Sequence, residues 1–104
     1  MPVIDLSRED LAILLRVLRD HLPPDTDVWA FGSRTRGEAR RYSDLDLAVR
    51  GGTALNADML ARLRDALSES DLTIKVDVVD LRAVDRAFQR IIEDQMVSLS
   101  LQGR

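Results

Sequence analysis

The chain has 104 residues, of which 45% are hydrophobic and 32% are charged, and its formal net charge is −3 at pH 7. This size and composition predict one globular domain over residues 1–104 and exclude a disordered chain. The acidic balance argues against binding to nucleic acid or to an anionic membrane surface, and the absence of cysteine excludes disulfides, thiolate metal sites and a cysteine nucleophile.

Export and membrane insertion have no support in the sequence. The N-terminal segment lacks the basic stretch followed by an apolar one that a secretory signal requires. No apolar run approaches the roughly 18–20 residues that span a bilayer. We therefore expect a cytoplasmic protein without a membrane-spanning segment.

The first part of the chain predicts a helix, a buried strand and a short second helix. Ser7 can cap a helix start, and it precedes a stripe of leucines at helical spacing: Leu11, Leu14, Leu15, Leu18 and Leu22. Pro23-Pro24 ends this helix. Residues 28–31 are apolar, partly β-branched and stop at Gly32, which predicts a buried strand. The polar, arginine-rich segment 33–42 is expected to begin as a short helix directly from the turn.

The rest of the chain predicts two further strands, each followed by a helix. Leu45, Leu47 and Val49 alternate with more polar or smaller residues, which is the two-residue period of a strand. A second amphipathic helix is marked by Leu55, Met59, Leu60, Leu63 and Leu67. A third strand alternates through Ile74, Val76, Val78 and Leu81. The last helix is expected over residues 83–98, with inward-facing Val84, Ala87, Phe88, Ile91, Ile92 and Met96. This order predicts an α/β (α+β) fold in which helices flank a small mixed sheet of three to four strands.

The turn Phe31-Gly32-Ser33 is the first candidate functional feature. A strand that runs through glycine into a helix start exposes backbone N–H groups that can bind phosphate oxygens. Gly32 has no Cβ, so the backbone can approach a ligand closely, and Ser33 adds a hydroxyl donor. Taken alone, such a pair is more often a plain turn between two elements.

Asp44 and Asp46 are the second candidate feature. Residues two apart on a strand point to the same face, so the two carboxylates would lie side by side. They repel one another unless a cation lies between them, and Mg²⁺ prefers such oxygen ligands. The alternative is the solvent-facing side of an edge strand. The opposite face, with Leu45, Leu47 and Val49, clearly belongs to the core.

A third carboxylate would complete a metal site if two strands are neighbours. Asp77 lies in the strand of residues 74–79 and shares a face with Lys75 and Val79. Three carboxylates could then converge on one metal cluster. Asp80, at the end of the same strand, is a competitor for the third place.

These motifs together resemble the signature of the DNA polymerase β-like nucleotidyltransferase superfamily, and most closely its minimal nucleotidyltransferase (MNT) branch. The pattern is Gly32-Ser33, a second glycine at Gly37, and then Ser43-Asp44-Leu45-Asp46-Leu47. The third family carboxylate comes from a later strand and matches Asp77. The motif core covers residues 31–49, and the similarity in element order extends over nearly the whole chain.

The resemblance implies nucleotidyl transfer with two Mg²⁺ ions and ATP as the substrate. Asp44, Asp46 and Asp77 would be the catalytic metal ligands, and the nucleotide would be bound by Gly32, Ser33, Arg34, Arg36 and Ser43. For the arginines, a solvated helix face that balances an acidic protein is the alternative reading.

The resemblance also implies a partner, because MNT proteins of this size typically pair with a HEPN-domain RNase toxin. The MNT chain then acts as antitoxin, in characterised members by transferring AMP to a tyrosine of the toxin. The short chain leads us to expect that the acceptor is a separate macromolecule, or that the partner completes the site. The rival hypothesis is a binding module that neutralises the toxin by contact alone. Direct nucleic-acid binding is disfavoured, since the sequence lacks a basic stripe with aromatics.

Overall fold

The computed structural model describes residues 4, 6–32, 34, 44–52 and 55–99. Within these ranges the elements follow in this order: α1 (Arg8–His21), β1 (Asp27–Phe31), β2 (Leu45–Arg50), α2 (Ala57–Glu69), β3 (Val76–Asp80), α3 (Arg86–Glu93) and β4 (Val97–Leu99). The short helix predicted after Gly32 falls on a segment that lies almost entirely outside the described residues. No helix in the described ranges is long and apolar enough to cross a membrane.

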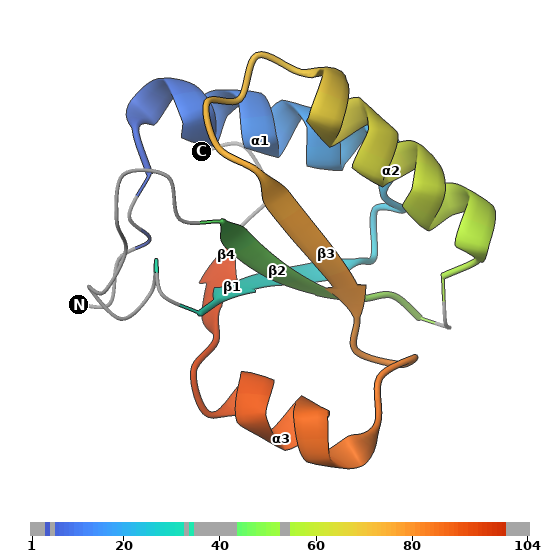
Figure 1. Ribbon diagram of the computed structural model, residues 1–104. Coiled ribbons are helices and arrows are strands. Elements are labelled where there is room, and N and C mark those ends of the chain that lie inside the picture. The colour runs from blue at the N-terminus through green and yellow to red at the C-terminus, as the bar shows by residue number, and fades with distance from the viewer. Residues whose placement is uncertain (1–3, 5, 33, 35–43, 53–54, 100–104) are drawn as a thin grey trace.

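The four strands form one mixed sheet in the order β3-β2-β1-β4 (Figure 1). β1 is antiparallel to both of its neighbours, whereas β2 and β3 are parallel. A parallel pair cannot be joined by a tight turn, and here α2 forms the crossover between the two strands. The predicted fold class is therefore confirmed.

The first helix begins and ends where the sequence predicts. The Ser7 side chain accepts a hydrogen bond from the Asp10 N–H at 3.1 Å, which satisfies one of the free amides of the first turn. The helix ends at His21, ahead of the two prolines. Leu14 and Leu18 on its inner face are completely buried.

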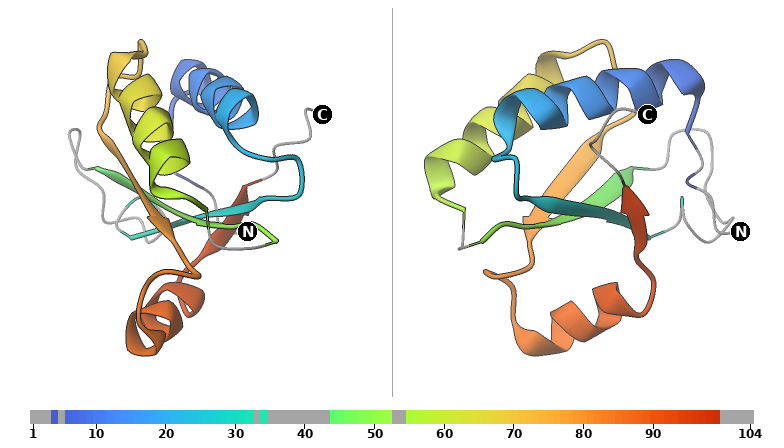
Figure 2. Two further views of the ribbon diagram at one scale, coloured as in Figure 1. Left: turned by 90° about the vertical axis from the view of Figure 1, so that its right-hand side faces the viewer. Right: turned by 180° about the vertical axis from the view of Figure 1, so that it is seen from behind.

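Helices cover both faces of the sheet, α1 and α2 on one and α3 on the other (Figures 1 and 2). The larger core lies under α1 and α2, and Leu45, Leu47 and Val49 of β2 are buried in it at 0% exposure. A smaller cluster of Ala48, Leu81 and Ile92 lies on the α3 side. Successive residues of β2 therefore point to opposite faces of the sheet, with the apolar alternation facing α1 and α2 and Ala48 facing α3.

The predicted last helix over residues 83–98 is wrong in its second half. α3 ends at Glu93, and Val97–Leu99 form β4, which pairs with β1 through Ala30↔Val97 and Val28↔Leu99. A strand of three residues is too short to show a two-residue period, and the spacing of Ile92, Met96 and Leu99 also fits a helix. Pairing with β1 outweighs that local pattern, because it supplies backbone hydrogen bonds along an edge of β1 that would otherwise lack a strand.

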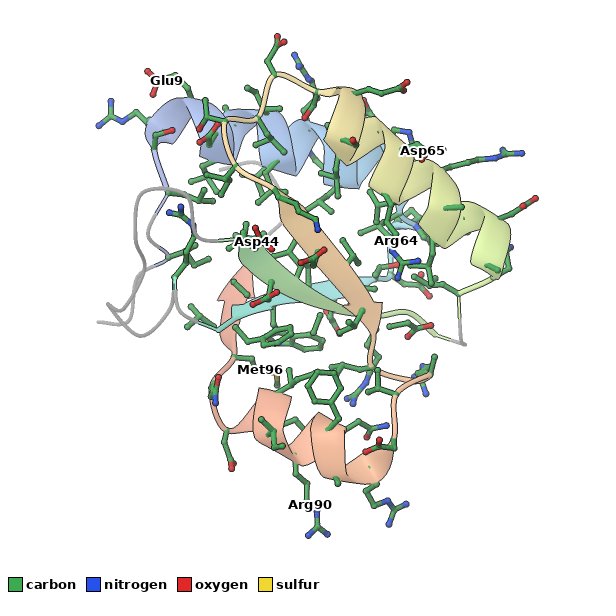
Figure 3. All side chains as sticks on the ribbon, in the orientation of Figure 1. Glu9, Asp44, Arg64, Asp65, Arg90 and Met96 are labelled. Atoms are coloured by element: carbon green, nitrogen blue, oxygen red, sulfur yellow. The ribbon has the colours of Figure 1, made fainter. Side chains whose placement is uncertain are left out.

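The expected inward face of this helix is also partly wrong. Ile92 is fully buried, whereas Phe88 is 37% exposed, Ile91 is 54% exposed and Ala87 is exposed as well. Figure 3 shows Met96 between the sheet and α3, whereas Arg90 points away from the sheet. α3 has eight residues, and of these Ile92 is the buried one.

Candidate active site

Gly32 places the turn after β1 directly against a carboxylate of β2. The last residue of β1, Phe31, is the register partner of Asp46, so the chain turns away from the sheet beside that side chain. Gly32 has a φ of +88°, a region that residues with a side chain rarely adopt. A Cβ at this position would lie 2.5 Å from Asp46 Oδ2. The turn backbone can come this close only because the residue is glycine.

The structure brings the predicted carboxylates to neighbouring strands. Asp46 on β2 and Asp77 on β3 are register partners in the parallel pair, which meets the condition on which the prediction for Asp77 rested. Asp44 is exposed and lies just before β2 begins, as Figure 3 shows. Asp46 and Asp77 are on the α3 side of the sheet, like Ala48 and Val79, and Asp46 lies beside Phe31, which packs against the α3 cluster.

The electrostatics of this site favour a cation. Burial raises the pKa of Asp46, and the negative charges of Asp77 and Asp44 raise it further. Among the described residues, Asp77 forms an ion pair with Lys75 at 3.8 Å between Oδ1 and Nζ, and the two side chains are 48% and 71% exposed. Such a solvent-exposed pair contributes little to offset the repulsion between the carboxylates.

Oxygen-only donors of this kind fit Mg²⁺, and a positive charge between them would relieve their repulsion. In the conformation described, no three acidic, histidine or cysteine side chains within the covered ranges form a closed metal-binding group. Because Asp44 is exposed and Asp77 half-buried, their side chains have room to turn toward a cation. The donor set therefore fits the ion that the sequence predicts, with Asp46 as the most enclosed member.

Asp80 does not compete for the third place, because its carboxylate is used in the fold. It is buried and accepts hydrogen bonds from the Leu55 N–H at 2.9 Å and the Arg82 N–H at 3.0 Å. It also lies three residues after Asp77, which places it on the other face of the strand. Of the two candidates, only Asp77 lies beside Asp46.

Arg34 is the one predicted nucleotide-binding arginine that the structure describes, and it is buried at 7% exposure. Its positive charge is close enough to Asp10 to contribute to lowering the pKa of that carboxyl group. The other predicted nucleotide-binding residues in this region, Ser33, Arg36 and Ser43, lie outside the described residues.

Asp10 is a residue of this region that the sequence did not single out. Its carboxylate is 4% exposed and accepts hydrogen bonds from Thr73 Oγ1 at 2.5 Å and Thr73 N–H at 3.0 Å. Burial would raise the pKa of Asp10, but the hydrogen bonds from Thr73 and Ser7, together with the charge of Arg34, lower it. Asp10 thereby ties α1 to the segment that leads into β3. In the sequence it is simply an acidic residue in the first turn of a helix, because its partner Thr73 is 63 residues away.

The sequence pattern of the family described as "Polymerase beta, Nucleotidyltransferase" matches residues 14–100. The chain belongs to this nucleotidyltransferase family. The matched range contains Gly32 and all three predicted metal ligands. The resemblance inferred from the motifs is thus confirmed, and with it the class of enzyme.

Two relatives place this nucleotidyltransferase more narrowly. It is 45% identical to a probable protein adenylyltransferase MntA of Haemophilus influenzae, over 86% of this chain and 77% of that protein. It is 36% identical to the protein adenylyltransferase MntA of Shewanella oneidensis over 67% of this chain, and the match spans only 50% of that relative.

Solved structures of similar chains agree. A chain of a toxin–antitoxin crystal structure with AMP-PNP matches at a TM-score of 0.73 and 30% identity, covering 90% of this chain and 73% of that one. A chain from the structure of the tri-AMPylated Shewanella oneidensis HEPN toxin in complex with MNT antitoxin matches at a TM-score of 0.66 and 25% identity. The match covers 95% of this chain and 74% of that one.

Proposed function

We propose that this nucleotidyltransferase transfers AMP from ATP to a hydroxyl group of a HEPN-domain partner, a tyrosine hydroxyl in the first instance, and acts as its antitoxin. The observation that carries the proposal is the register pairing of Asp46 with Asp77 beside the Gly32 turn. The relatives named as protein adenylyltransferases and the AMPylated toxin in a similar complex support the choice of group and acceptor. A cytoplasmic location is part of the same proposal.

In this reaction the acceptor oxygen forms a bond to the α-phosphorus of ATP, the bond from that phosphorus to the bridging oxygen of the β-phosphate breaks, and pyrophosphate and the hydroxyl proton are released. Asp44, Asp46 and Asp77 would hold the Mg²⁺ ions. When bound, these ions would neutralise the triphosphate and lower the pKa of the attacking hydroxyl.

The chain's own backbone and carboxylates orient this reaction. Gly32, without a Cβ, lets phosphate oxygens reach the amide groups of the turn. The contact between Gly32 and Asp46 fixes the distance between the phosphate-binding turn and the carboxylates. Placement of this kind accelerates a transfer by holding the reacting atoms in line.

The test is to co-express the chain with the protein encoded next to it, which we expect to be a HEPN-domain protein, and to follow transfer of labelled AMP from ATP and Mg²⁺ to the purified partner. We expect wild type to label the partner, and Asp44→Asn and Asp46→Asn to lose the label by roughly 100-fold or more while the complex stays intact. Asp65→Asn, which changes an exposed acidic residue of α2, is the matched control and should label normally.

One outcome favours the rival hypothesis of a binding module. If wild type suppresses the toxicity of its partner without ever labelling it, and Asp46→Asn suppresses it equally well, contact alone neutralises the toxin. The clustered carboxylates argue against this outcome, since contact with a partner has no need of them.

A further inference from the structure

β3 lies at one margin of the sheet, so on one side it has no neighbouring strand within the described part of the chain. The Lys75 carbonyl accepts a hydrogen bond from the Leu45 N–H at 2.9 Å, which shows that Lys75 directs its backbone toward β2. In a parallel pair the residues in alternate positions direct both of their backbone groups away from the partner strand. Val76 therefore presents its amide and carbonyl groups along the outer edge of β3, and Val78 presents its amide there, while the Val78 carbonyl already accepts a hydrogen bond from Arg64.

A groove of about 760 Å³ follows this edge between β3 and α2. Its lining is largely apolar, with side chains of Leu67, Leu72 and Ile74 among its walls. Asp77 also lines it, so the groove reaches one of the carboxylate residues of the candidate active site, beside its register partner Asp46. An apolar channel beside a strand edge has the features needed to bind an extended peptide: backbone groups to pair with and surface to cover side chains.

Basic side chains stand along the same groove. Arg64 of α2 lines it, and Figure 3 shows Arg64 beside β3, where its Nη2 donates to the Val78 carbonyl at 2.8 Å. A guanidinium has five N–H donors, so this single bond leaves Arg64 able to bind a carboxylate. The Lys75 side chain, which also lines the groove, is 71% exposed. In a chain of net charge −3, these two basic side chains favour a segment that carries an acidic residue.

We propose that the groove along the outer edge of β3 binds the extended segment of the protein acceptor that presents the hydroxyl group to the carboxylates. This inference rests on the proposed function, because it assumes that the acceptor is a protein. It extends that function by stating where the acceptor segment binds and which kinds of residue surround its hydroxyl group.

The pleat of a strand determines how such a segment would be oriented. Successive side chains of an extended peptide point to opposite faces, and the two faces of β3 differ. A residue directed to the side of Asp77 reaches the carboxylates, whereas its immediate neighbours are directed to the apolar side of the groove, near Leu67. The acceptor hydroxyl is therefore flanked on both sides by apolar residues, with an acidic residue within reach of Arg64.

Hydrogen exchange on the assembled complex tests this placement without depending on catalysis. The amide protons of Val76 and Val78 face the outer edge, so they should exchange readily in the free chain and slow at least about tenfold when the cognate HEPN-domain partner is bound. Unchanged exchange of both amides in the complex would overturn the proposal. Protection already present in the free chain and growing with its concentration would assign the edge to a second copy, and would overturn it as well.

Steady-state kinetics with variants of α2 supply the second readout. Ser68→Trp fills the groove from an exposed position, and Arg64→Glu reverses its charge. Both should raise the KM for the partner by about tenfold or more, which corresponds to about 1.4 kcal/mol of binding, and leave the affinity for ATP unchanged. The matched controls are Glu69→Trp and Arg62→Glu, on the same helix but outside the groove, and they should behave as wild type.

The outcomes separate the two proposals. If wild type labels the partner but both groove variants have an unchanged KM, the proposal for the groove is wrong and the proposed function stands. Protection of Val76 and Val78 without any labelling keeps the groove as a contact with the partner and overturns the transfer. If ATP with Mg²⁺ alone protects these amides, and Ser68→Trp raises the KM for ATP instead, the groove binds the nucleotide and the proposal is wrong.

Discussion

Among the single residues of the site, Gly32 and Asp46 constrain one another most closely. The turn needs a positive φ, and the carboxylate occupies the space that a side chain at position 32 would require. Neither requirement is visible in a Gly-Ser pair read alone, which is why the sequence left a plain turn open as an alternative. The close approach of the two residues converts a weak motif into a specific geometric relation between the turn proposed to bind phosphate and the carboxylates.

Gly32→Ala should therefore impair both folding and transfer. The added Cβ would lie 2.5 Å from Asp46 Oδ2 at a φ of +88°. We expect a loss of about 1–3 kcal/mol in the free energy of unfolding and a roughly 10–100-fold drop in AMP transfer, since the carboxylate must move. Urea unfolding and the labelling assay measure the two effects. Gly52→Ala is the control, because its added Cβ would meet only the exposed Asp25, at 3.1 Å. Equal behaviour of the two variants would contradict the role of Gly32.

Unlike Gly32, Asp46 lowers the stability of the fold, because its negative charge is unfavourable in the folded protein. Its raised pKa means that ionisation at neutral pH destabilises the fold, and that this penalty is relieved as the pH falls through the raised pKa toward the ordinary aspartate range. Without divalent cations at pH 7, Asp46→Asn should raise the Tm by about 1–5 °C, the effect of removing roughly 0.2–1 kcal/mol of cross-strand repulsion.

Thermal unfolding across pH measures this gain, which should shrink toward acid pH. Adding Mg²⁺ should raise the Tm of wild type more than that of the variant, because the cation replaces the repulsion by attraction. The exposed Asp65→Asn serves as the control. A variant that is less stable than wild type without metal would show that the carboxylates do not repel one another.

At the scale of elements, α3 depends on a narrow contact with the sheet. Ile92 is fully buried in the smaller cluster, and Phe88 stacks edge-on against Phe31 with ring centroids 6.4 Å apart. The adjacent Ile91 is 54% exposed, although helical periodicity alone assigned both isoleucines to the core. The two residues lie on different sides of α3, and this, rather than hydrophobicity, decides which of them is buried.

This pair yields a direct test of the helix orientation. Ile92→Ala should lower the free energy of unfolding by about 2–4 kcal/mol, the usual cost of an aliphatic side chain removed from a packed core. Ile91→Ala should change it by less than about 0.5 kcal/mol. Chemical denaturation of the two variants side by side provides the measurement. Equal losses would mean that α3 is rotated, as the sequence pattern had indicated.

At the scale of the whole molecule, Asp10 joins parts of the chain that local patterns treat separately. Its hydrogen bonds to Thr73 connect α1 with the segment that enters β3, and its neighbour Arg34 belongs to the segment that follows the Gly32 turn. Asp77 lies four residues beyond Thr73, so the position of β3 depends in part on this link. The carboxylate is ionised at neutral pH, since its pKa is lowered.

Asp10→Ala should cost about 2–4 kcal/mol at pH 7, because charge-assisted hydrogen bonds to a buried group are lost. The sign of the pH dependence follows from the lowered pKa: the stabilisation is complete above the ordinary aspartate range and is lost as the pH falls through the lowered value. Urea unfolding from pH 7 to pH 2 should therefore show wild type converging on the variant in acid. Asp20→Ala, at an exposed position of α1, is the control and should show no such convergence.

Much of this protein could be predicted from local patterns in the sequence. The cap at Ser7, the prolines after His21 and the alternation of Leu45, Leu47 and Val49 each express a short-range rule of backbone geometry, and the structure confirms them. The family could be inferred for a similar reason, since Gly32, Asp44 and Asp46 are close enough in sequence to form a readable motif.

Only the tertiary structure decided the features that join distant segments. The pairing of β2 with β3 brings Asp77 beside Asp46, the pairing of Val97–Leu99 with β1 ends the last helix early, and the link from Asp10 to Thr73 spans 63 residues. The groove beside β3 likewise exists only because α2 and β3 are packed together. Local spacing determines which element a segment forms, but strand order and burial arise from the competition of all segments for one core, and this competition has no signature in any single stretch of sequence.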